Sequence, residues 1–178
     1  GETAFLDYRE KAPLASYRDM YIDSHGEVIE NASLIGGLAI GVPGTVAGFW
    51  KAHRRFGSLP WETLIEPAIK LAEEGFIPAN ILVDDIHSMD EWFGDRTNFK
   101  KYFSKIRVDE PFKQPELAKT LRRISEFGAD DFYRGETAKM IVEEMNRSNG
   151  LITAEDLENY NAVWREPLRS NWREYEIV

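Results

Sequence analysis

The chain has 178 residues, a formal net charge of −9 and no cysteine. An acidic surface of this kind repels nucleic acids and anionic lipids, which argues against both as partners. The absence of cysteine excludes disulfides, thiolate nucleophiles and cysteine metal sites, and no apolar run approaches the ~20 residues that a bilayer-spanning helix needs.

Both ends of the chain have strand-like sequence. Residues 5–8 form a short β-like run that ends before Pro13, because proline lacks a backbone donor and restricts the residue before it. Residues 172–178 alternate as a strand does. Natural domains more often end in polar tails, so we expect this chain to belong to a longer protein. Its first residues lack the basic start and apolar block of a signal peptide.

A glycine-rich segment, residues 35–50, has the sequence IGGLAIGVPGTVAGFW. Its spacing does not match the Gly-x-Gly-x-x-Gly of dinucleotide-binding turns, and no lysine follows Gly44 as a phosphate loop requires. We therefore interpret these glycines as structural, with Gly48 permitting a close approach to the helix that carries it. Within the same segment, Leu38 and Ile40 predict one short strand.

Hydrophobic side chains recur at helical spacing in six segments. These are residues 46–56, 60–74, 79–93, 115–127, 136–147 and a short helix that begins after the capping residue Thr153. Thr45 is expected to cap the first helix, and Pro67 to kink or split the second. Residues 94–112 lack the periodicity and predict a loop. The expected fold class is α+β and mostly helical, with strands that lack obvious partners within the chain.

Few residues suggest catalysis or ligand binding on their own. The three histidines, His25, His53 and His87, have no second ligand at metal-site spacing, and no Gly-x-Ser-x-Gly elbow supports a serine hydrolase. Arg9 stands where the first β-like run ends and a bend begins. A guanidinium there can present its planar fork to a carboxylate, although such an arginine more often forms only a surface ion pair.

Nine blocks of sequence are more specific than any single motif, because they occur in one fixed order. They are DYREKAP (7–13), RDMY (18–21), GVPGTVAGF (41–49), GSLPW (57–61), PAIKLA (67–72), GF (75–76), QPELA (114–118), FYRG (132–135) and GLITAEDL (150–157). Together they resemble the large subunit of γ-glutamyltranspeptidase. The resemblance extends over nearly the whole chain, and only residues 86–112 fall outside it.

This resemblance implies a fold and a reaction. The fold would be part of the four-layer αββα sandwich of N-terminal-nucleophile hydrolases. A precursor would cleave itself into a large and a small subunit, and the new N-terminal threonine of the small subunit would attack a γ-glutamyl amide such as glutathione, with its own α-amine as the base. Water or an amino acid or peptide acceptor would then resolve the γ-glutamyl-enzyme. No cofactor or metal is implied.

The resemblance also assigns a binding residue. Arg9 corresponds to the arginine of an Arg-Glu-x-Ala-Pro motif that holds the α-carboxylate of the γ-glutamyl group. Holding this carboxylate determines which amide reaches the nucleophile. Glu10 is expected to orient Arg9 or a neighbouring strand, a role that the resemblance supports less directly than that of Arg9.

The catalytic nucleophile is expected outside this chain. Thr45, Thr120 and Thr153 lie in predicted caps or helices rather than at a cleavage point. Residues 1–178 would then be a single segment of the large subunit, inactive alone, with the small subunit of the same precursor as its partner. A periplasmic or extracellular location is implied by the family; with no signal peptide in this chain, a cytoplasmic location stays open.

Two alternatives remain at this point. The segment could be a non-catalytic helical module that binds a partner, or it could belong to a related acyl transferase that acts on poly-γ-glutamate. A threonine-led catalytic segment beyond Val178 would favour an enzyme, whereas a natural stop codon there would favour the module.

Overall fold

The computed structural model describes residues 2–178, with the exception of the side chain of Asp95. The helices are α1 (Thr45–Phe56), α2 (Trp61–Glu74), α3 (Asn80–Phe93), α4 (Phe99–Phe103), α5 (Pro115–Phe127), α6 (Ala129–Arg134), α7 (Glu136–Arg147) and α8 (Ala154–Glu158), with 3₁₀ turns η1 (Gly37–Ala39) and η2 (Gly94–Arg96). The strands are β1 (Phe5–Asp7), β2 (Val163–Arg165), β3 (Ser170–Trp172) and β4 (Tyr175–Ile177). The predicted mostly helical α+β composition is confirmed.

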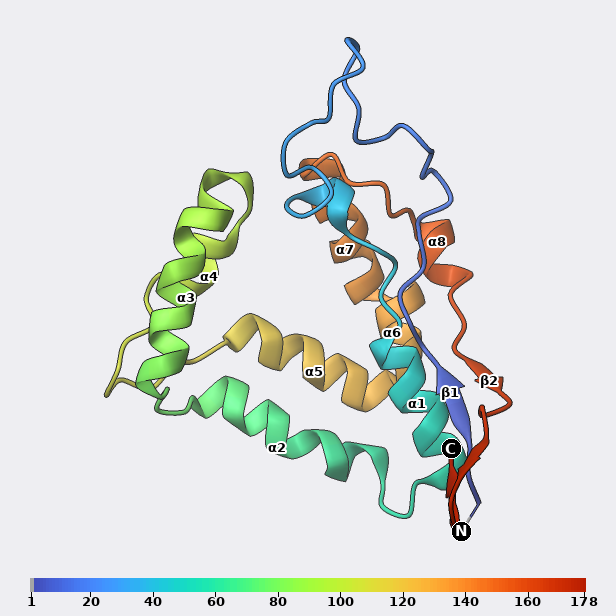
Figure 1. Cartoon of the computed structure of the whole chain (residues 1–178). Helices are drawn as coiled ribbons and strands as arrows, with labels where there is room; N and C mark the ends of the chain where they lie inside the picture. Colours follow the sequence, from blue (N-terminus) through green and yellow to red (C-terminus); the bar gives the residue numbers. More distant parts are fainter. Residues whose placement is uncertain (1) are drawn as a thin grey trace.

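The main body of the molecule is built around α1, α6, α7 and α8 (Figure 1). Its core is one cluster of buried side chains, which are Val42, Tyr133, Ala138, Met145, Ile152, Leu157 and Tyr160. The rings of Tyr133 and Tyr160 stack with centroids 5.5 Å apart. Burial of these apolar surfaces is the main stabilising term for this region.

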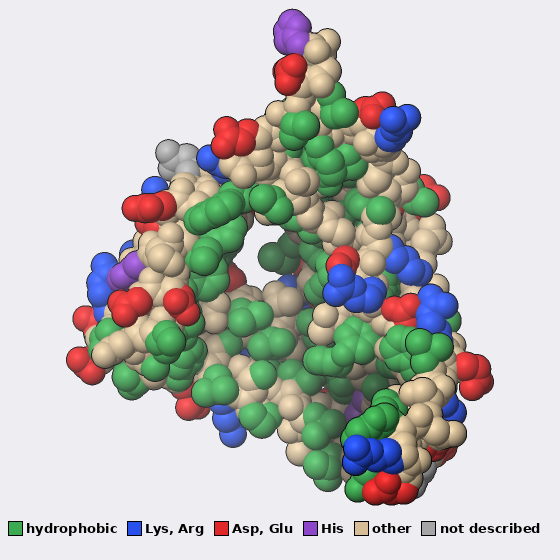
Figure 2. All heavy atoms as spheres, viewed as in Figure 1, with side chains coloured by type: hydrophobic (Ala, Val, Ile, Leu, Met, Phe, Trp, Pro, Cys, Tyr) green, Lys and Arg blue, Asp and Glu red, His purple; other side chains and the backbone are tan. Residues whose placement is uncertain are grey.

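Two long helices, α2 and α5, run side by side away from the body and lead to an arm formed by α3 and α4 (Figure 1). The indole nitrogen of Trp61 donates a hydrogen bond of 2.9 Å to the carbonyl of Ile124, which joins α2 to α5. In the space-filling view an opening separates the arm from the body (Figure 2). The arm is connected to the rest of the chain through the α2–α5 pair, and Asn98, just before α4, donates a 3.2 Å hydrogen bond to Glu144 of α7.

The strands form two separate antiparallel pairs, β1 with β2 and β3 with β4. Phe5 lies opposite Arg165 and Asp7 opposite Val163. The prediction that the strands lack partners in the chain was therefore wrong, because β1 pairs with a strand about 160 residues later. The predicted single strand over 172–178 was also wrong, since β3 and β4 turn back on each other in a hairpin.

Three further local predictions needed correction. Leu38 lies in the 3₁₀ turn η1 instead of a strand, after Gly36 adopts a φ of 100°. The N-cap of α1 is Gly44, so Thr45 is the first helical residue. Of the two outcomes expected at Pro67, a kink or a split, the split does not occur, because α2 continues through Pro67.

The predicted loop over residues 94–112 contains η2 and the short helix α4. An aromatic series stabilises it: the ring centroids of Phe93 and Phe99 lie 4.9 Å apart, and those of Phe99 and Phe103 4.8 Å apart. Contacts between aromatic rings can support a helix that is too short to show periodicity. The periodicity argument failed here for that reason.

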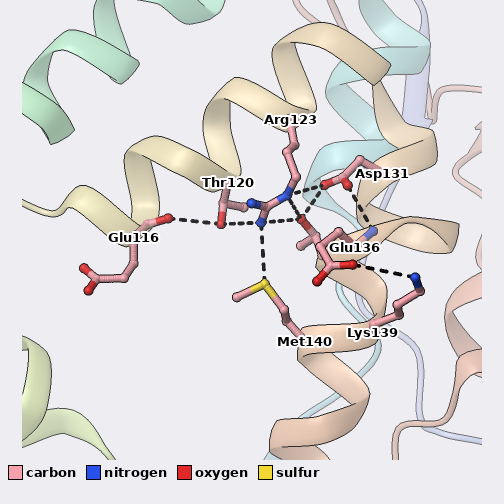
Figure 3. Close-up of polar contacts among 8 residues, drawn as sticks. Glu116, Thr120, Arg123, Asp131, Glu136, Lys139 and Met140 are labelled. Atoms are coloured by element: carbon pink, nitrogen blue, oxygen red, sulfur yellow. Dashed lines mark hydrogen bonds and ion pairs between the residues drawn. The ribbon is translucent and has the colours of Figure 1, made fainter.

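A polar cluster connects α5, α6 and α7 (Figure 3). The carboxylate of Asp131 accepts hydrogen bonds from the Glu136 N–H at 3.1 Å and from the Thr137 hydroxyl. The guanidinium of Arg123 approaches the same carboxylate at 3.4 Å and also donates to Thr120. Each of these side chains has partners within the cluster, so it acts as a cross-link between helices.

Candidate substrate-binding site

The segment that carries Arg9 starts at the end of β1. One carboxylate oxygen of Asp7 accepts the Arg9 N–H at 3.1 Å, and the other accepts the Arg165 Nε at 2.6 Å. The hydrogen bond from Arg165, aided by the one from the Arg9 backbone, lowers the pKa of Asp7 below its ordinary value. An ionised Asp7 thus fixes the turn at Arg9 to the neighbouring strand β2.

The Arg9 side chain points into solvent, with 84% of its surface exposed. Its Nη2 atom lies 3.0 Å from a carboxylate oxygen of Glu10, which is itself 53% exposed. An exposed ion pair of this kind contributes roughly 0–1 kcal/mol. Because a guanidinium has five N–H donors and Glu10 engages one edge, Arg9 retains donors for a second carboxylate.

Arg9 and Glu10 line an open cavity of about 420 Å³. Its walls are formed by residues of β1 and the segment after it together with the start of α1, namely Phe5, Leu6, Asp7, Tyr8, Arg9, Glu10 and Thr45. The exposed guanidinium therefore belongs to a concave surface instead of a convex one. Such a surface can be completed by further polypeptide.

Two glycines, Gly44 at the N-cap of α1 and Gly48 within it, explain how the Arg9 segment comes so close to this helix. A Cβ atom at Gly48 would overlap with the ring of Tyr8, and one at Gly44 would overlap with the Tyr8 carbonyl oxygen and the Tyr160 hydroxyl. The structural interpretation of the glycine-rich segment is confirmed at these positions. Gly48 admits Tyr8 against the helix, as its predicted role in close approach requires.

The residues around α8 hold the Arg9 segment at two points. The hydroxyl of Tyr160 donates a 2.8 Å hydrogen bond to the Arg9 carbonyl. Farther along, Asp156 accepts a 2.7 Å hydrogen bond from the Leu14 N–H. Between them, Lys11 and Val42 exchange backbone hydrogen bonds of 3.2 and 2.8 Å. The backbone from Arg9 to Leu14 is thus fixed at both ends and in the middle.

The sequence alone did not reveal these two contacts of α8. The predicted capping box is confirmed, because Thr153 and Asp156 exchange hydrogen bonds at the start of α8. Asp156 has a second role, since it accepts the N–H of Leu14 from 142 positions away. At the level of sequence, the one signal for Tyr160 is that a tyrosine follows directly after a capped helix.

The other sequence candidates lie in structural positions. Thr45 begins α1, Thr120 donates to a carbonyl within α5, and Thr153 caps α8. His53 packs between aromatic rings, and its Nε2 lies 2.8 Å from the Leu59 carbonyl. Within the described part of the chain, no group of three or more His, Asp or Glu side chains is placed to hold a metal ion. No described helix is both long and apolar enough to span a membrane.

A comparison with known protein families identifies the family of this chain. The gamma-glutamyltranspeptidase family model matches residues 1–178. The chain belongs to this family. The glutathione hydrolase proenzyme of Pseudomonas aeruginosa is 50% identical over 173 residues, which are 97% of this chain and 31% of that protein. The resemblance identified from the nine sequence blocks is confirmed.

Solved structures of γ-glutamyltranspeptidases show the same fold. The enzyme from Pseudomonas nitroreducens, complexed with L-DON, is 50% identical with a TM-score of 0.96, over 99% of this chain and 53% of that one. The Helicobacter pylori enzyme is 41% identical with a TM-score of 0.93, over 99% of this chain and 52% of that one. The expected placement within an N-terminal-nucleophile hydrolase fold is confirmed. This chain spans about half of these solved chains and about a third of the curated relative.

Proposed function

We propose that this chain is the large-subunit segment of an autoprocessed γ-glutamyl transferase and hydrolase, with glutathione and related γ-glutamyl amides as substrates. Family membership supports the reaction class. The observation that carries the binding role is the Arg9 guanidinium, 84% exposed on the wall of an open cavity. The Arg9 backbone is held by Asp7 and Tyr160, while its side chain, beside Glu10 at one edge, stays exposed to a ligand.

In this proposal Arg9 binds the α-carboxylate of the γ-glutamyl group. A guanidinium and a carboxylate form two parallel N–H···O bonds, which set direction as well as distance. Glu10, 3.0 Å from Arg9, limits the rotation of the guanidinium and so helps to orient it. With the α-carboxylate fixed, the γ-carbonyl group at the other end of the glutamyl moiety is presented to the nucleophile.

The nucleophile is the N-terminal threonine of the small subunit, supplied by the rest of the precursor. Its hydroxyl attacks the γ-carbonyl carbon, and the departing amine takes up the proton that the threonine loses. The resulting ester passes the γ-glutamyl group to water or to an amino acid or peptide amine, which restores the hydroxyl. The partner of this chain is therefore the small subunit, and the proposed place of action is the periplasm or the extracellular space.

The role of Arg9 is tested by Arg9→Ala in the complete precursor. Loss of charge-assisted hydrogen bonds costs about 1.5–3 kcal/mol, so we expect the KM for a γ-glutamyl anilide to rise about 10- to 100-fold. The value of kcat should change less, since the contact is made to a part of the substrate that does not react. Steady-state kinetics on the processed enzyme measure both values.

Arg18→Ala is a matched control. Arg18 is also an exposed arginine that pairs with the next residue, Asp19, at 3.6 Å, but it does not line the cavity around Arg9. The Arg18→Ala variant should leave KM unchanged. In a separate measurement, the isolated 178-residue chain should show no turnover. A KM in Arg9→Ala equal to that of the unaltered enzyme would show that Arg9 does not bind the substrate.

A further inference from the structure

Tyr160 is a buried residue with a direct bond to the segment that carries Arg9. It lies just beyond α8 and is only 5% exposed. Its hydroxyl donates to the Arg9 carbonyl at 2.8 Å, across 151 positions of sequence. Because the Arg9 N–H is bonded to Asp7, both polar groups of the Arg9 backbone have partners. The Arg9 side chain alone is left exposed.

The ring of Tyr160 makes two further contacts. It stacks on Tyr133 with 11° between the ring planes. The ammonium group of Lys11 lies 5.1 Å from the ring centroid. The close approach of Gly44 to the Tyr160 hydroxyl leaves no room for a side chain at residue 44. The hydroxyl therefore has one location, and that location is at the Arg9 carbonyl.

Burial, followed by the charges of Asp7 and Glu10, raises the pKa of Tyr160 above its ordinary value. The hydroxyl stays protonated and acts as a hydrogen-bond donor throughout the neutral pH range. An arginine side chain is long and flexible, so the position of its backbone sets where its guanidinium can reach. A shift of this backbone would therefore move the guanidinium away from the substrate carboxylate and weaken that contact.

We propose that Tyr160 is a positioning residue for γ-glutamyl substrates: its hydroxyl fixes the backbone of Arg9, so that the guanidinium meets the substrate α-carboxylate. This proposal rests on the role of Arg9 given above. Tyr160 does not touch the substrate in it.

The test is Tyr160→Phe in the complete precursor, because it removes the hydroxyl and keeps the stacked ring. Loss of one hydrogen bond worth about 1 kcal/mol predicts a rise in the KM for a γ-glutamyl anilide of about fivefold. The value of kcat should stay within about twofold. Melting temperatures measured on the same samples separate a binding defect from a folding defect.

Tyr133→Phe is the matched control. Tyr133 is equally buried and forms the other half of the stack, but its hydroxyl donates to the Pro43 carbonyl at 2.7 Å and accepts from the Ala47 N–H. It should lower the melting temperature at least as much as Tyr160→Phe and leave KM unchanged. Equal rises of KM in both variants would show a general structural effect and overturn the proposal.

A double variant shows whether Tyr160 acts through Arg9. In the Arg9→Ala background, Tyr160→Phe should raise KM no further, because the group that it positions is gone. An additional fivefold rise there would overturn the positioning role. If Arg9→Ala raises KM and Tyr160→Phe alone does not, only the inference about Tyr160 fails. If Arg9→Ala leaves KM unchanged, the proposed binding site itself fails.

Discussion

Two buried aspartates in this molecule, Asp131 and Asp156, have nearly the same local surroundings. Each is 5% exposed. Each accepts a hydrogen bond from a threonine hydroxyl and from a backbone N–H at the start of a helix, α7 for Asp131 and α8 for Asp156. A carboxylate at such a site stabilises the helix by satisfying free N–H groups and by its charge.

The two aspartates differ in their third partner. Asp131 pairs with Arg123 of α5 and so joins three helices (Figure 3). Asp156 accepts the N–H of Leu14, which lies in the segment that carries Arg9. The same hydrogen-bonding chemistry therefore joins helices in one place and holds the Arg9 segment in the other. What a buried carboxylate does is decided by the partner that comes from a distant part of the sequence.

The largest expected effect is the loss of stability when Asp131 is replaced. Asp131→Ala in the complete precursor leaves the partly buried Arg123 without its carboxylate and α7 without its cap. Removal of one partner of a buried pair costs about 3 kcal/mol or more. We expect a clear fall in melting temperature with an unchanged KM for a γ-glutamyl anilide. A raised KM at preserved melting temperature would contradict the purely structural role.

Asp156→Ala should give a smaller loss of stability and an additional change in binding. Loss of the α8 cap and of the bond to Leu14 is expected to cost about 2 kcal/mol. The KM should rise about two- to fivefold, because the Arg9–Leu14 backbone is then held at fewer points. Kinetics and melting curves on the same preparation check both. If KM were unchanged, the two aspartates would have the same role.

The sequence was sufficient for the features that depend on near neighbours. The helices predicted over 115–127 and 136–147 occur with those bounds, because their apolar period is regular and glycine or proline marks their ends. The capping box at Thr153 is also local, and it was predicted for the same reason. The helix α4 was missed because contacts between phenylalanine rings, not periodicity, support it.

The sequence was not sufficient for contacts between distant segments. The pairing of β1 with β2 and the bond from Tyr160 to Arg9 join residues more than 150 positions apart, and no local pattern encodes such a choice. Arg9 itself was found through the family motif. Its exposure and the cavity beside it come only from the folded chain. Tyr160 has no motif of its own at the sequence level.

The smallest expected effect is a pH dependence of stability that arises from the carboxyl group of Asp156. Burial alone would raise the pKa of this carboxyl, but the hydrogen bonds from Leu14 and Thr153 outweigh it and lower the pKa below the ordinary value of 3.8. A group with a lowered pKa stabilises the fold fully above that ordinary value, and its contribution is lost as the pH falls through the folded-state pKa. The unaltered enzyme should therefore lose more stability than Asp156→Asn below about pH 4.

Melting temperatures of the two proteins at pH 7, 5, 4 and 3 test this difference. The gap between them should be constant from pH 7 to 5 and should narrow at pH 4 and 3, as the carboxylate is protonated and its advantage over the amide is lost. Tyr133→Phe is the control, because burial raises the pKa of Tyr133 to about 12 and its hydroxyl keeps its proton over this range. The difference in melting temperature between Tyr133→Phe and the unaltered protein should not vary with pH. A gap for Asp156→Asn that is equally constant down to pH 3 would mean that the charge of Asp156 does not hold the Arg9 segment.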